Sequence, residues 1–406
     1  LQQCTGPVMA KGVEDTAFYR YNRLLSLNEV GGTPEQFGTS LATFHEQNRE
    51  RLQRWPHALL ATTTHDTKRS EDVRARINVL SEIPQEWRAA LNRWSKLNKK
   101  KKLLVDGQPV PDRNEEYLLY QTLLGAWPLT AMNADAYAVF KQRIQDYIRK
   151  ATKEAKVNTS WINPNQAYDD ALQEFVGTVL DGSLFLNDFQ ALRSRIAQYG
   201  MYNSLSQTLL KLTVPGVPDI YQGTELWDFS LVDPDNRRPV DYERRRRELS
   251  ALQEQIRTNG QHLAGLARRL LDTREDGCIK LYVIHRTLTY RREHPDLFRC
   301  GVYLPLDTLG PRQQHVCAFA RQHEQQAVLV VAPRFLTRLI PDPQTLPLGP
   351  PVWGDSWLTL HAASTNHHYR NLFTGERVTA VNRDGTMALA LGEVFADFPV
   401  ALLEAV

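Results

Sequence analysis

The sequence predicts an α/β fold followed by a separate antiparallel β region, and three observations support this prediction. Residues 58–64 have the pattern of a short buried strand that leads into a polar loop and then a helix, which is the order of a βα unit. Residues 81–198 carry apolar side chains at three- and four-residue intervals, as helices do. Beyond residue 310, short apolar runs alternate with turn residues, which indicates antiparallel strands.

The first predicted strand ends in a cluster of charged and hydroxyl side chains. Residues 58–64 are apolar and then rich in threonine, and the charged run 65–72 follows directly. A helix is expected next, over residues 73–77, capped by Ser70 or Asp72. Ionisable groups at the end of a buried strand are costly to desolvate unless they pair with one another or bind a polar ligand. The cluster is therefore a candidate site, and a surface group of ion pairs is the alternative.

The region 81–198 is expected to be a helical insertion, because residues such as Trp87, Leu91 and Trp94 recur at helical spacing. Inside it lies a basic run over residues 99–102. We interpret this run as a solvated loop and not as a nucleic-acid patch. No aromatic residue lies between the lysines, and the chain is nearly neutral.

A second buried strand is expected within residues 214–225, where a short apolar stretch flanked by proline and glycine leads to polar and aromatic side chains. The polar loop 233–241 follows, and then a long charged helix over residues 242–271. The arginine run 244–247 is interpreted as a solvated face of that helix.

The C-terminal region is expected to form an antiparallel β-sandwich of about 90 residues. Residues 382–385 have the composition of a turn. The predicted strands lie at 316–320, 327–332, 357–361, 369–373, 387–391 and 400–403.

Composition narrows the classes of partner. The net charge is +3, from 49 basic and 46 acidic residues, which is too small a surplus to indicate nucleic acid or an anionic membrane. No apolar run approaches the ~20 residues that span a bilayer. The 4 cysteines are irregularly spaced, so we expect neither a zinc site nor a disulfide framework, and a cytoplasmic location. No metal motif or phosphate loop is found, and no cofactor is expected.

Four stretches resemble segments of one known family. Each stretch is long, and they occur in the family's order from residue 1 to about residue 245. They are residues 9–21 (similar to the sixth-strand segment), 64–76 (the seventh-strand motif), 160–165 with Tyr168 (a signature of the helical insertion), and 215–226 with 233–241 (the eighth strand and its loop).

On these motifs the chain resembles the maltooligosyl trehalose synthases of the α-amylase superfamily, glycoside hydrolase family 13. With the patterns above, the resemblance implies the C-terminal part of a (β/α)8 barrel. Strands 6 and 7 are expected over residues 1–80, the helical insertion over 81–198, strand 8 and following helices over 199–309, and the sandwich over 310–406.

The resemblance implies the activity of a (1→4)-α-D-glucan 1-α-D-glucosylmutase, an isomerase of trehalose biosynthesis. Such an enzyme converts the reducing-end α-1,4 link of a maltooligosaccharide into an α,α-1,1 link by intramolecular transglycosylation with retention. Asp66 is the expected catalytic residue, because it matches the superfamily's third carboxylate, which holds the sugar at the cleavage point. His65 matches the adjacent sugar-binding histidine.

Further substrate-binding residues are expected on the same basis. Lys11 and Lys68 match positions that donate to sugar hydroxyls, although an isolated lysine is more often simply solvated. The aromatic members can stack on a sugar or belong to the core, and the charged members of the 233–241 loop can bind substrate or pair with each other. The remaining predicted residues are Glu14, Tyr19, Arg69, Trp161, Asn163, Tyr168, Tyr221, Gln222, Glu225, Asp233, Asp235 and Arg237.

Retaining transglycosylation requires a carboxylate nucleophile and a carboxylic acid roughly 5 Å apart. In the family these belong to the fourth and fifth barrel strands, and neither pattern is found in this sequence. We therefore expect a C-terminal portion that is inactive alone and acts on α-1,4-glucan with the missing N-terminal half. A non-catalytic glucan-binding remnant and an α-glucan hydrolase of the same superfamily are the alternatives.

Overall fold

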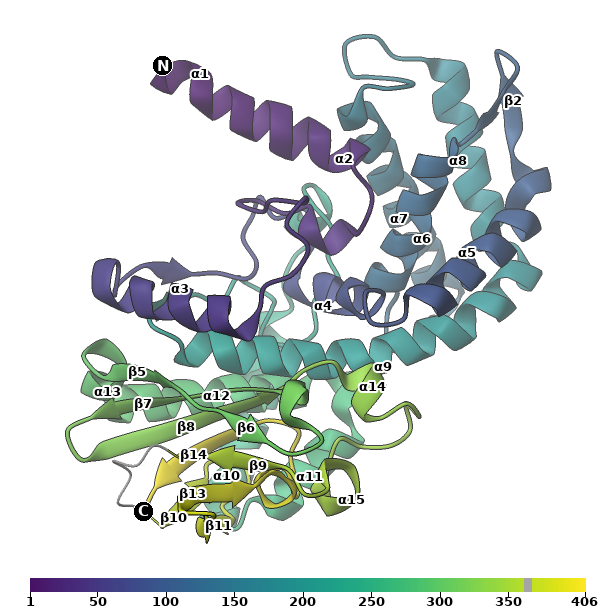
Figure 1. Cartoon of the computed structure of the whole chain (residues 1–406). Coiled ribbons are helices and arrows are strands. Elements are labelled where there is room, and N and C mark those ends of the chain that lie inside the picture. Colours follow the sequence, from purple (N-terminus) through teal and green to yellow (C-terminus); the bar gives the residue numbers. More distant parts are fainter. Residues whose placement is uncertain (361–366) are drawn as a thin grey trace. The chain divides into compact units, whose positions relative to one another are not determined.

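The structure is a computed structural model that describes residues 1–360 and 367–406, and the chain divides into two compact units. The first comprises residues 1–37, 63–200 and 228–238, and the second comprises residues 38–62, 201–227 and 239–406. Each unit thus combines segments that are distant in the sequence (Figure 1). The described residues have a mixed α/β architecture with four sheets.

The first unit is mainly helical. Among its described residues, the sheet structure is one small hairpin. Helix α9 (Ser183–Thr213) begins in this unit and ends in the second. The other elements are α1 (Gln2–Pro7), the π-helix η1 (Val8–Ala17), α2 (Phe18–Arg20), η2 (Leu25–Leu27), α4 (Glu71–Val79), α5 (Pro84–Asn98), η3 (Lys99–Lys101), β2 (Leu103–Val105), β3 (Gln108–Val110), α6 (Arg113–Ala126), α7 (Ala134–Ala155), α8 (Gln166–Leu180) and η4 (Asp235–Arg237).

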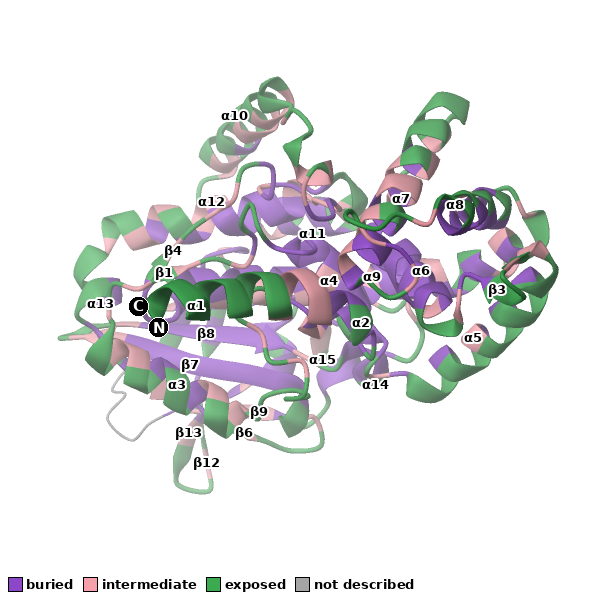
Figure 2. Cartoon of the chain, turned by 90° about the horizontal axis from the view of Figure 1, so that it is seen from above, coloured by how far each residue is buried: buried purple, intermediate pink, exposed green. Residues whose placement is uncertain are grey.

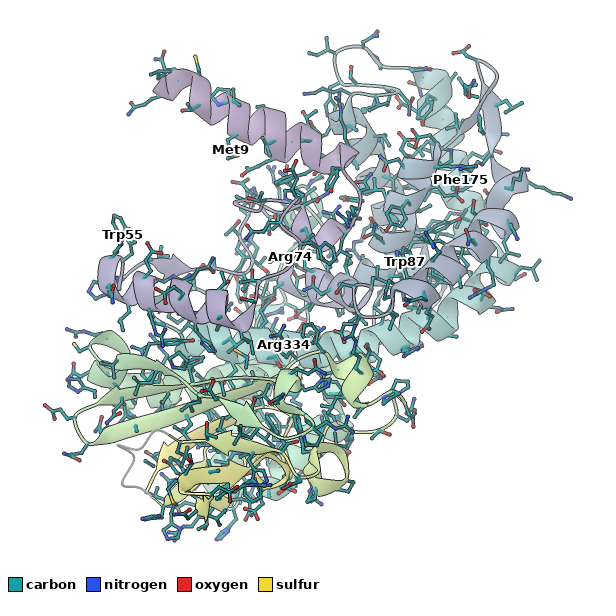
Figure 3. All side chains as sticks on the ribbon, in the orientation of Figure 1. Met9, Trp55, Arg74, Trp87, Phe175 and Arg334 are labelled. Atoms are coloured by element: carbon teal, nitrogen blue, oxygen red, sulfur yellow. The ribbon has the colours of Figure 1, made fainter. Side chains whose placement is uncertain are left out.

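The N-terminal segment is helical where the resemblance implied a barrel strand over residues 9–21. Helices α1, η1 and α2 run without interruption, and Met9 projects from them into solvent (Figure 3). Within the described residues no strand lies beside this segment. An unpaired strand leaves its N–H and C=O groups without partners, whereas a helix satisfies them internally. The implied strand is therefore replaced by a helix.

Residues 81–198 are largely helical, as the apolar spacing predicted, and an aromatic cluster fills their interior. The fully buried Trp94 contacts Tyr120 and Phe185 edge-on, with ring centroids 5.4 and 5.6 Å away. The basic run 99–102 agrees only in part with the expected solvated loop: Lys99 and Lys100 are exposed, and they belong to the short helix η3. It leads into the β2–β3 hairpin, and Lys102 is mostly buried with its Nζ 2.8 Å from the Glu116 carboxylate.

Helix α4 begins after Ser70, one of the two predicted caps, but the capping bond is absent. The Ser70 hydroxyl donates to the carbonyl oxygen of Asp228 (2.5 Å), and the Asp72 carboxylate accepts from the Asp228 N–H (2.8 Å). The start of α4 is thus tied to the segment 228–238 of the same unit.

In the second unit, the two strands predicted to be buried are only two residues long, and neither is buried, since Leu59 is 76% exposed and Val217 is 42% exposed. β1 (Leu59–Leu60) pairs in parallel with β4 (Val217–Pro218). Each has one described neighbour, and isolated two-stranded pairs are marginal, which explains why the strands expected within 58–64 and 214–225 are so short. The helix expected over 242–271 is divided into α10 (Tyr242–Asn259) and α11 (Ala264–Asp272), because Gly260 ends α10 at a positive φ of 58°.

The second unit also contains helices and short helical turns. None of the helices in the described part of the chain has the length and apolarity of a membrane span. The remaining helical elements are α3 (Leu41–Arg54), η5 (Arg274–Asp276), α12 (Cys278–Glu293), α13 (Pro295–Arg299), η6 (Gln313–His315), α14 (Leu336–Leu339), α15 (Gly349–Trp353) and α16 (Leu391–Val394).

The C-terminal strands form two antiparallel sheets, and the turn at 382–385 connects β12 to β13. Residues of β7 and β8 are mostly buried (Figure 2). The predicted strand at 357–361 is β9, and residue 361 lies outside the described residues. The packing of the sheets as a sandwich stays a prediction. One sheet has the order β11 (Arg377–Thr379), β10 (His368–Asn371), β14 (Ala401–Ala405), β8 (Gln326–Pro333), β7 (Val316–His323), β5 (Val302–Pro305), and the other β12 (Val381–Arg383), β13 (Thr386–Ala390), β9 (Trp357–Thr359), β6 (Thr308–Leu309).

Candidate functional site

The loop between residues 64 and 70 has an exposed tip formed by His65 and Asp66. The Asn236 side-chain amide donates to the His65 carbonyl oxygen (2.7 Å), which joins the tip to the loop 233–237. The Asp66 carboxylate has no hydrogen-bond partner among the described residues. An ionised carboxylate can accept several hydrogen bonds, so Asp66 is available to bind hydroxyl groups from a ligand.

The base of the same loop is buried and held by Glu29. The backbone N–H groups of Lys68 and Arg69 both donate to the Glu29 carboxylate, at 2.6 and 3.1 Å. The Arg69 guanidinium donates to the Leu25 carbonyl oxygen (3.3 Å) and the Tyr147 hydroxyl (2.7 Å). Arg69, predicted to bind substrate, therefore has its guanidinium inside the unit, where it stabilises the loop.

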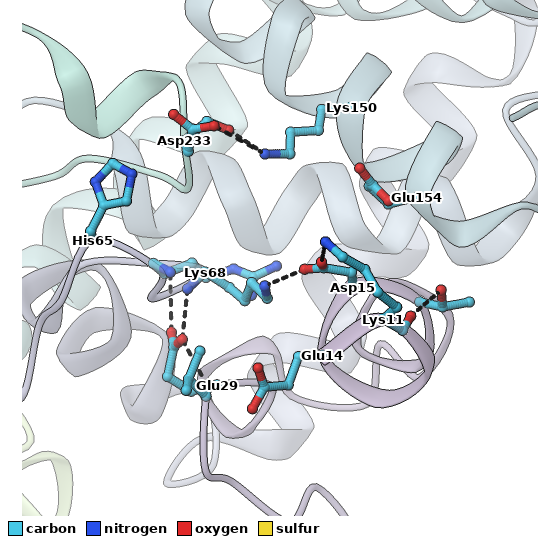
Figure 4. Close-up of polar contacts among 12 residues, drawn as sticks. Lys11, Glu14, Asp15, Glu29, His65, Lys68, Lys150, Glu154 and Asp233 are labelled. Carbon is cyan, nitrogen blue, oxygen red and sulfur yellow. Dashed lines mark hydrogen bonds and ion pairs between the residues drawn. The ribbon is translucent and has the colours of Figure 1, made fainter. Parts of the chain in front are cut away.

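Lys68 and Lys11 share one carboxylate, that of Asp15 (Figure 4). The Lys68 Nζ lies 2.7 Å from Asp15 Oδ1, and the Lys11 Nζ lies 2.6 Å from Oδ2. Burial alone would raise the pKa of Asp15, but the hydrogen bonds from the two lysines lower it below its ordinary value. The hydrogen bond to Asp15 raises the pKa of Lys11. Lys11 is therefore a charged donor at neutral pH.

Glu14 and Tyr19, two further predicted residues of the N-terminal segment, are less exposed to solvent than Lys11. Glu14 is half-buried, and its carboxylate accepts from the Gly31 N–H (3.4 Å). Tyr19 is buried, and its hydroxyl has no hydrogen-bond partner in the described residues. Burial raises the pKa of Tyr19 well above its ordinary value, so the phenol stays protonated.

The loop 233–237 contains three predicted residues with different partners. Asp233 accepts a hydrogen bond at its carbonyl from Lys150 and forms an ion pair with the exposed Arg237. Asp235 is almost fully buried and accepts two hydrogen bonds from Arg143, at 2.7 and 2.8 Å. Burial alone would raise the pKa of Asp235, and the bonds from Arg143 lower it. The oxygen atoms of the Asp235 carboxylate are therefore used in hydrogen bonds within the fold, whereas Asp233 and Arg237 lie near the surface.

Trp161 lies in an exposed loop that surrounds a small pocket. The pocket has a volume of about 360 Å³ and is lined by Glu154 and residues 156–163. The indole N–H of Trp161 donates to the Glu154 carboxylate (3.0 Å), and 55% of the residue surface stays exposed. Asn163 is also exposed, and its backbone pairs with Ser160.

Tyr168 belongs to the core, although it was predicted to bind substrate. It is buried, and its hydroxyl donates to the carboxylate of Glu115 while accepting from the Asn158 amide (2.8 Å). Burial raises the pKa of Glu115 to about 7, with the Tyr168 hydrogen bond opposing this shift. Tyr168 lies in the first turn of α8, where the helical spacing places its ring inward.

Three predicted residues belong to the second unit. Tyr221 is half-buried, and its carbonyl oxygen accepts from the Thr224 hydroxyl (2.7 Å). The exposed Gln222 accepts from the Tyr242 hydroxyl (3.3 Å). Glu225 pairs with Arg245 (2.9 Å), so the arginine run 244–247 is not entirely solvated.

Comparisons with known proteins identify the family. The chain is 40% identical over 387 residues, 95% of its length, to a protein of Mycobacterium tuberculosis whose curated name assigns it, by inference, to the maltooligosyl trehalose synthases. The counterpart from a second strain matches equally. The chain belongs to the maltooligosyl trehalose synthase family. It spans about 45% of the length of these relatives. No family model matches the chain.

Solved structures of the synthase family agree. A mutant form of maltooligosyltrehalose synthase from Arthrobacter ramosus matches with a TM-score of 0.80 and 36% identity, covering 100% of this chain and 46% of that one. The unaltered Arthrobacter ramosus enzyme gives a TM-score of 0.77 at 35% identity, with the same coverage. A further maltooligosyl trehalose synthase gives 0.73 at 31%, covering 98% of this chain and 46% of that one.

Sequence reasoning missed Asp15, Glu29, Lys150 and Glu154. Asp15 lies four residues after Lys11, and this spacing on a helix could have indicated their ion pair. Glu29, Lys150 and Glu154 gave no such signal, because their contacts are with residues distant in the sequence or with an irregular loop. Among the described residues, no group of three His, Cys, Asp or Glu side chains could hold a metal ion.

Proposed function

We propose that the chain is the C-terminal portion of a maltooligosyl trehalose synthase. Together with the rest of such an enzyme, it converts the reducing-end α-1,4 link of a maltooligosaccharide into an α,α-1,1 link. One observation carries the proposal: in a member of this family, Asp66 is exposed, without a hydrogen-bond partner among the described residues, on a loop whose base is fixed by Glu29.

Asp66 acts on the sugar as a hydrogen-bond acceptor. A carboxylate on a fixed loop accepts bonds from adjacent sugar hydroxyls and thereby holds the ring at the cleavage point. The rigid base matters, because a loop that is already ordered loses little conformational entropy when the ligand binds. His65 contacts the same sugar from the neighbouring position.

Lys68 and Lys11 supply hydroxyl-binding donors beside Asp66. Each ammonium group has three donors, and its bond to Asp15 uses one of them. The shared carboxylate of Asp15 keeps the two cations within reach of one ligand despite their mutual repulsion. Asp233 and Arg237 add an acceptor and a donor on the adjoining loop.

The nucleophile and the general acid come from the part of the enzyme outside this chain. The chain spans less than half of its relatives, which leaves room for the fourth and fifth barrel strands that hold those groups in the family. The parallel pairing of β1 with β4 supports their assignment as the seventh and eighth barrel strands. The reaction then proceeds with retention, in the cytoplasm and without a cofactor.

Reconstitution tests the proposal. The chain is combined with the N-terminal half of a synthase from the same family, and maltohexaose is the substrate. The expected product is non-reducing, because both anomeric carbons are joined in an α,α-1,1 link. Release of glucose or maltose as the main product would instead identify a hydrolase. Turnover by this chain alone would refute the assignment of the two missing groups.

A further inference from the structure

Helix α7 presents two charged side chains, Lys150 and Glu154, that sequence analysis did not select. They are four residues apart and therefore lie on one face of the helix. Each contacts a different predicted sugar-binding residue. Lys150 donates to the Asp233 carbonyl, and Glu154 accepts from the Trp161 indole N–H (3.0 Å).

Lys150 anchors the loop that carries Asp233. Its Nζ binds the Asp233 carbonyl and lies 4.0 Å from the Asp233 carboxylate (Figure 4). The lysine side chain is only 23% exposed, so the carbonyl bond forms in a partly dry environment. The same loop reaches the His65 carbonyl oxygen through the Asn236 amide (2.7 Å), which joins the loop that carries Asp233 to the loop that carries Asp66.

Glu154 and Lys153 together fix the indole ring of Trp161. Glu154 holds its N–H, and the Lys153 Nζ lies 5.4 Å from the ring centroid. Lys153 is itself fixed by a buried ion pair with Asp169 (2.7 Å). The indole is thus held by the hydrogen bond at its N–H and by the Lys153 cation, yet 55% of the residue surface is exposed. A fixed, exposed indole beside a pocket of about 360 Å³ is suited to stack on the apolar face of a sugar.

We propose that α7 is a positioning element for glucan length. Lys150, acting through Asp233, and Glu154, acting through Trp161, position two separate contacts that one long oligosaccharide meets together. Sugar units near Asp66 contact the Asp233 loop, and a more distant unit stacks on Trp161. This inference rests on the proposed function, because it takes α-1,4-glucan as the ligand.

Binding of two glucans of different length tests the inference. Isothermal titration of the whole chain with maltotriose and with maltohexaose gives their dissociation constants. Glu154→Leu releases the indole, so maltohexaose should bind about tenfold more weakly while maltotriose changes less than about twofold. Glu154→Gln keeps an oxygen acceptor for the indole N–H and should restore maltohexaose binding.

Lys150→Met should weaken both glucans by about fivefold, because it releases the loop beside Asp66. Lys150→Arg keeps a donor and should recover most of the affinity. Lys141→Met is the matched control, since Lys141 is on the same helix but pairs with Asp181 (2.6 Å). Circular dichroism on every variant checks that the total helix content is unchanged.

Three outcomes overturn the inference. If Glu154→Leu weakens the binding of maltotriose and maltohexaose equally, the effect does not depend on glucan length. If Glu154→Gln fails to restore maltohexaose binding, the hydrogen bond to the indole is not the cause of the effect. If the unaltered chain binds neither glucan while the reconstituted enzyme still forms non-reducing product, this inference fails and the proposed function stands.

Discussion

Asp66 was predicted to be catalytic and Asp235 to bind substrate, and the surroundings of these two carboxylates in the first unit are opposite. Asp66 is exposed and has no hydrogen-bond partner among the described residues. Asp235 is 9% exposed and accepts bonds from Arg143 and from the Leu231 N–H (2.8 Å). A carboxylate whose lone pairs are already used holds the fold, and one whose lone pairs are open can hold a sugar. The contrast shows that neighbouring polar loops contain both kinds of carboxylate, and that hydrogen-bond occupancy distinguishes them.

Asp66→Asn is the sharpest test of this contrast. In the reconstituted enzyme it should lower turnover of maltohexaose at least about a thousandfold, because the amide lacks the negative charge and one acceptor. The free energy of unfolding should change by less than about 0.5 kcal/mol, since no described bond is lost. Product assays and urea denaturation measure the two quantities. A large loss of stability would place Asp66 with the structural carboxylates.

Asp235→Ala should show the reverse. It leaves the mostly buried Arg143 without its anionic partner, so the unfolding free energy should fall by about 3 kcal/mol. Urea denaturation of the isolated chain measures this loss. As a control, Asp233→Ala removes a more exposed partner and should cost less than about 1 kcal/mol. Equal costs for the two variants would contradict the proposed difference between the residues.

Glu115 is a second carboxyl group buried within the fold, and its contribution to the free energy of unfolding should depend on pH. Its pKa is raised to about 7 in the folded chain by burial, against an ordinary value of 4.5. The folded state holds this proton more tightly than the unfolded state, so its contribution is fully present below about pH 4.5. Stability should then fall by up to about 3 kcal/mol as the pH rises towards and through 7.

Urea denaturation between pH 4.5 and 8 measures this fall, and Glu115→Gln provides its control. The amide does not titrate, so the fall attributable to this residue should disappear. An unchanged pH profile in the Gln variant would assign the effect to other groups.

The smallest expected effect concerns Lys11, the more exposed of the two lysines that pair with Asp15. Lys11→Met should change the unfolding free energy by less than about 0.5 kcal/mol, because a solvent-screened ion pair contributes little. Maltotriose should bind about threefold more weakly, since one charged donor is lost. Calorimetric titration measures this change. A stability loss without a change in affinity would make Lys11 a structural residue.

The sequence predicted the secondary structure of the C-terminal region better than that of the N-terminal segment. Each strand expected from apolar runs after residue 310 has a described counterpart. Some of them, such as β7 and β8, pair with their neighbour along the chain. The segment 9–21 was expected as a strand by resemblance and is helical. A parallel barrel strand requires partners distant in sequence, and none of the described strands lies beside this segment.

The sequence by itself determined the family, through motifs that are contiguous along the chain, and the helical or extended character of segments with clear apolar periodicity. Only the tertiary structure decided which polar side chains are open to a ligand. Asp235 is occupied because Arg143, 92 residues away in the sequence, reaches it, and Trp161 is held because Glu154 accepts its N–H across an irregular loop. Hydrogen-bond partners are chosen by proximity in space, and local sequence does not encode that proximity.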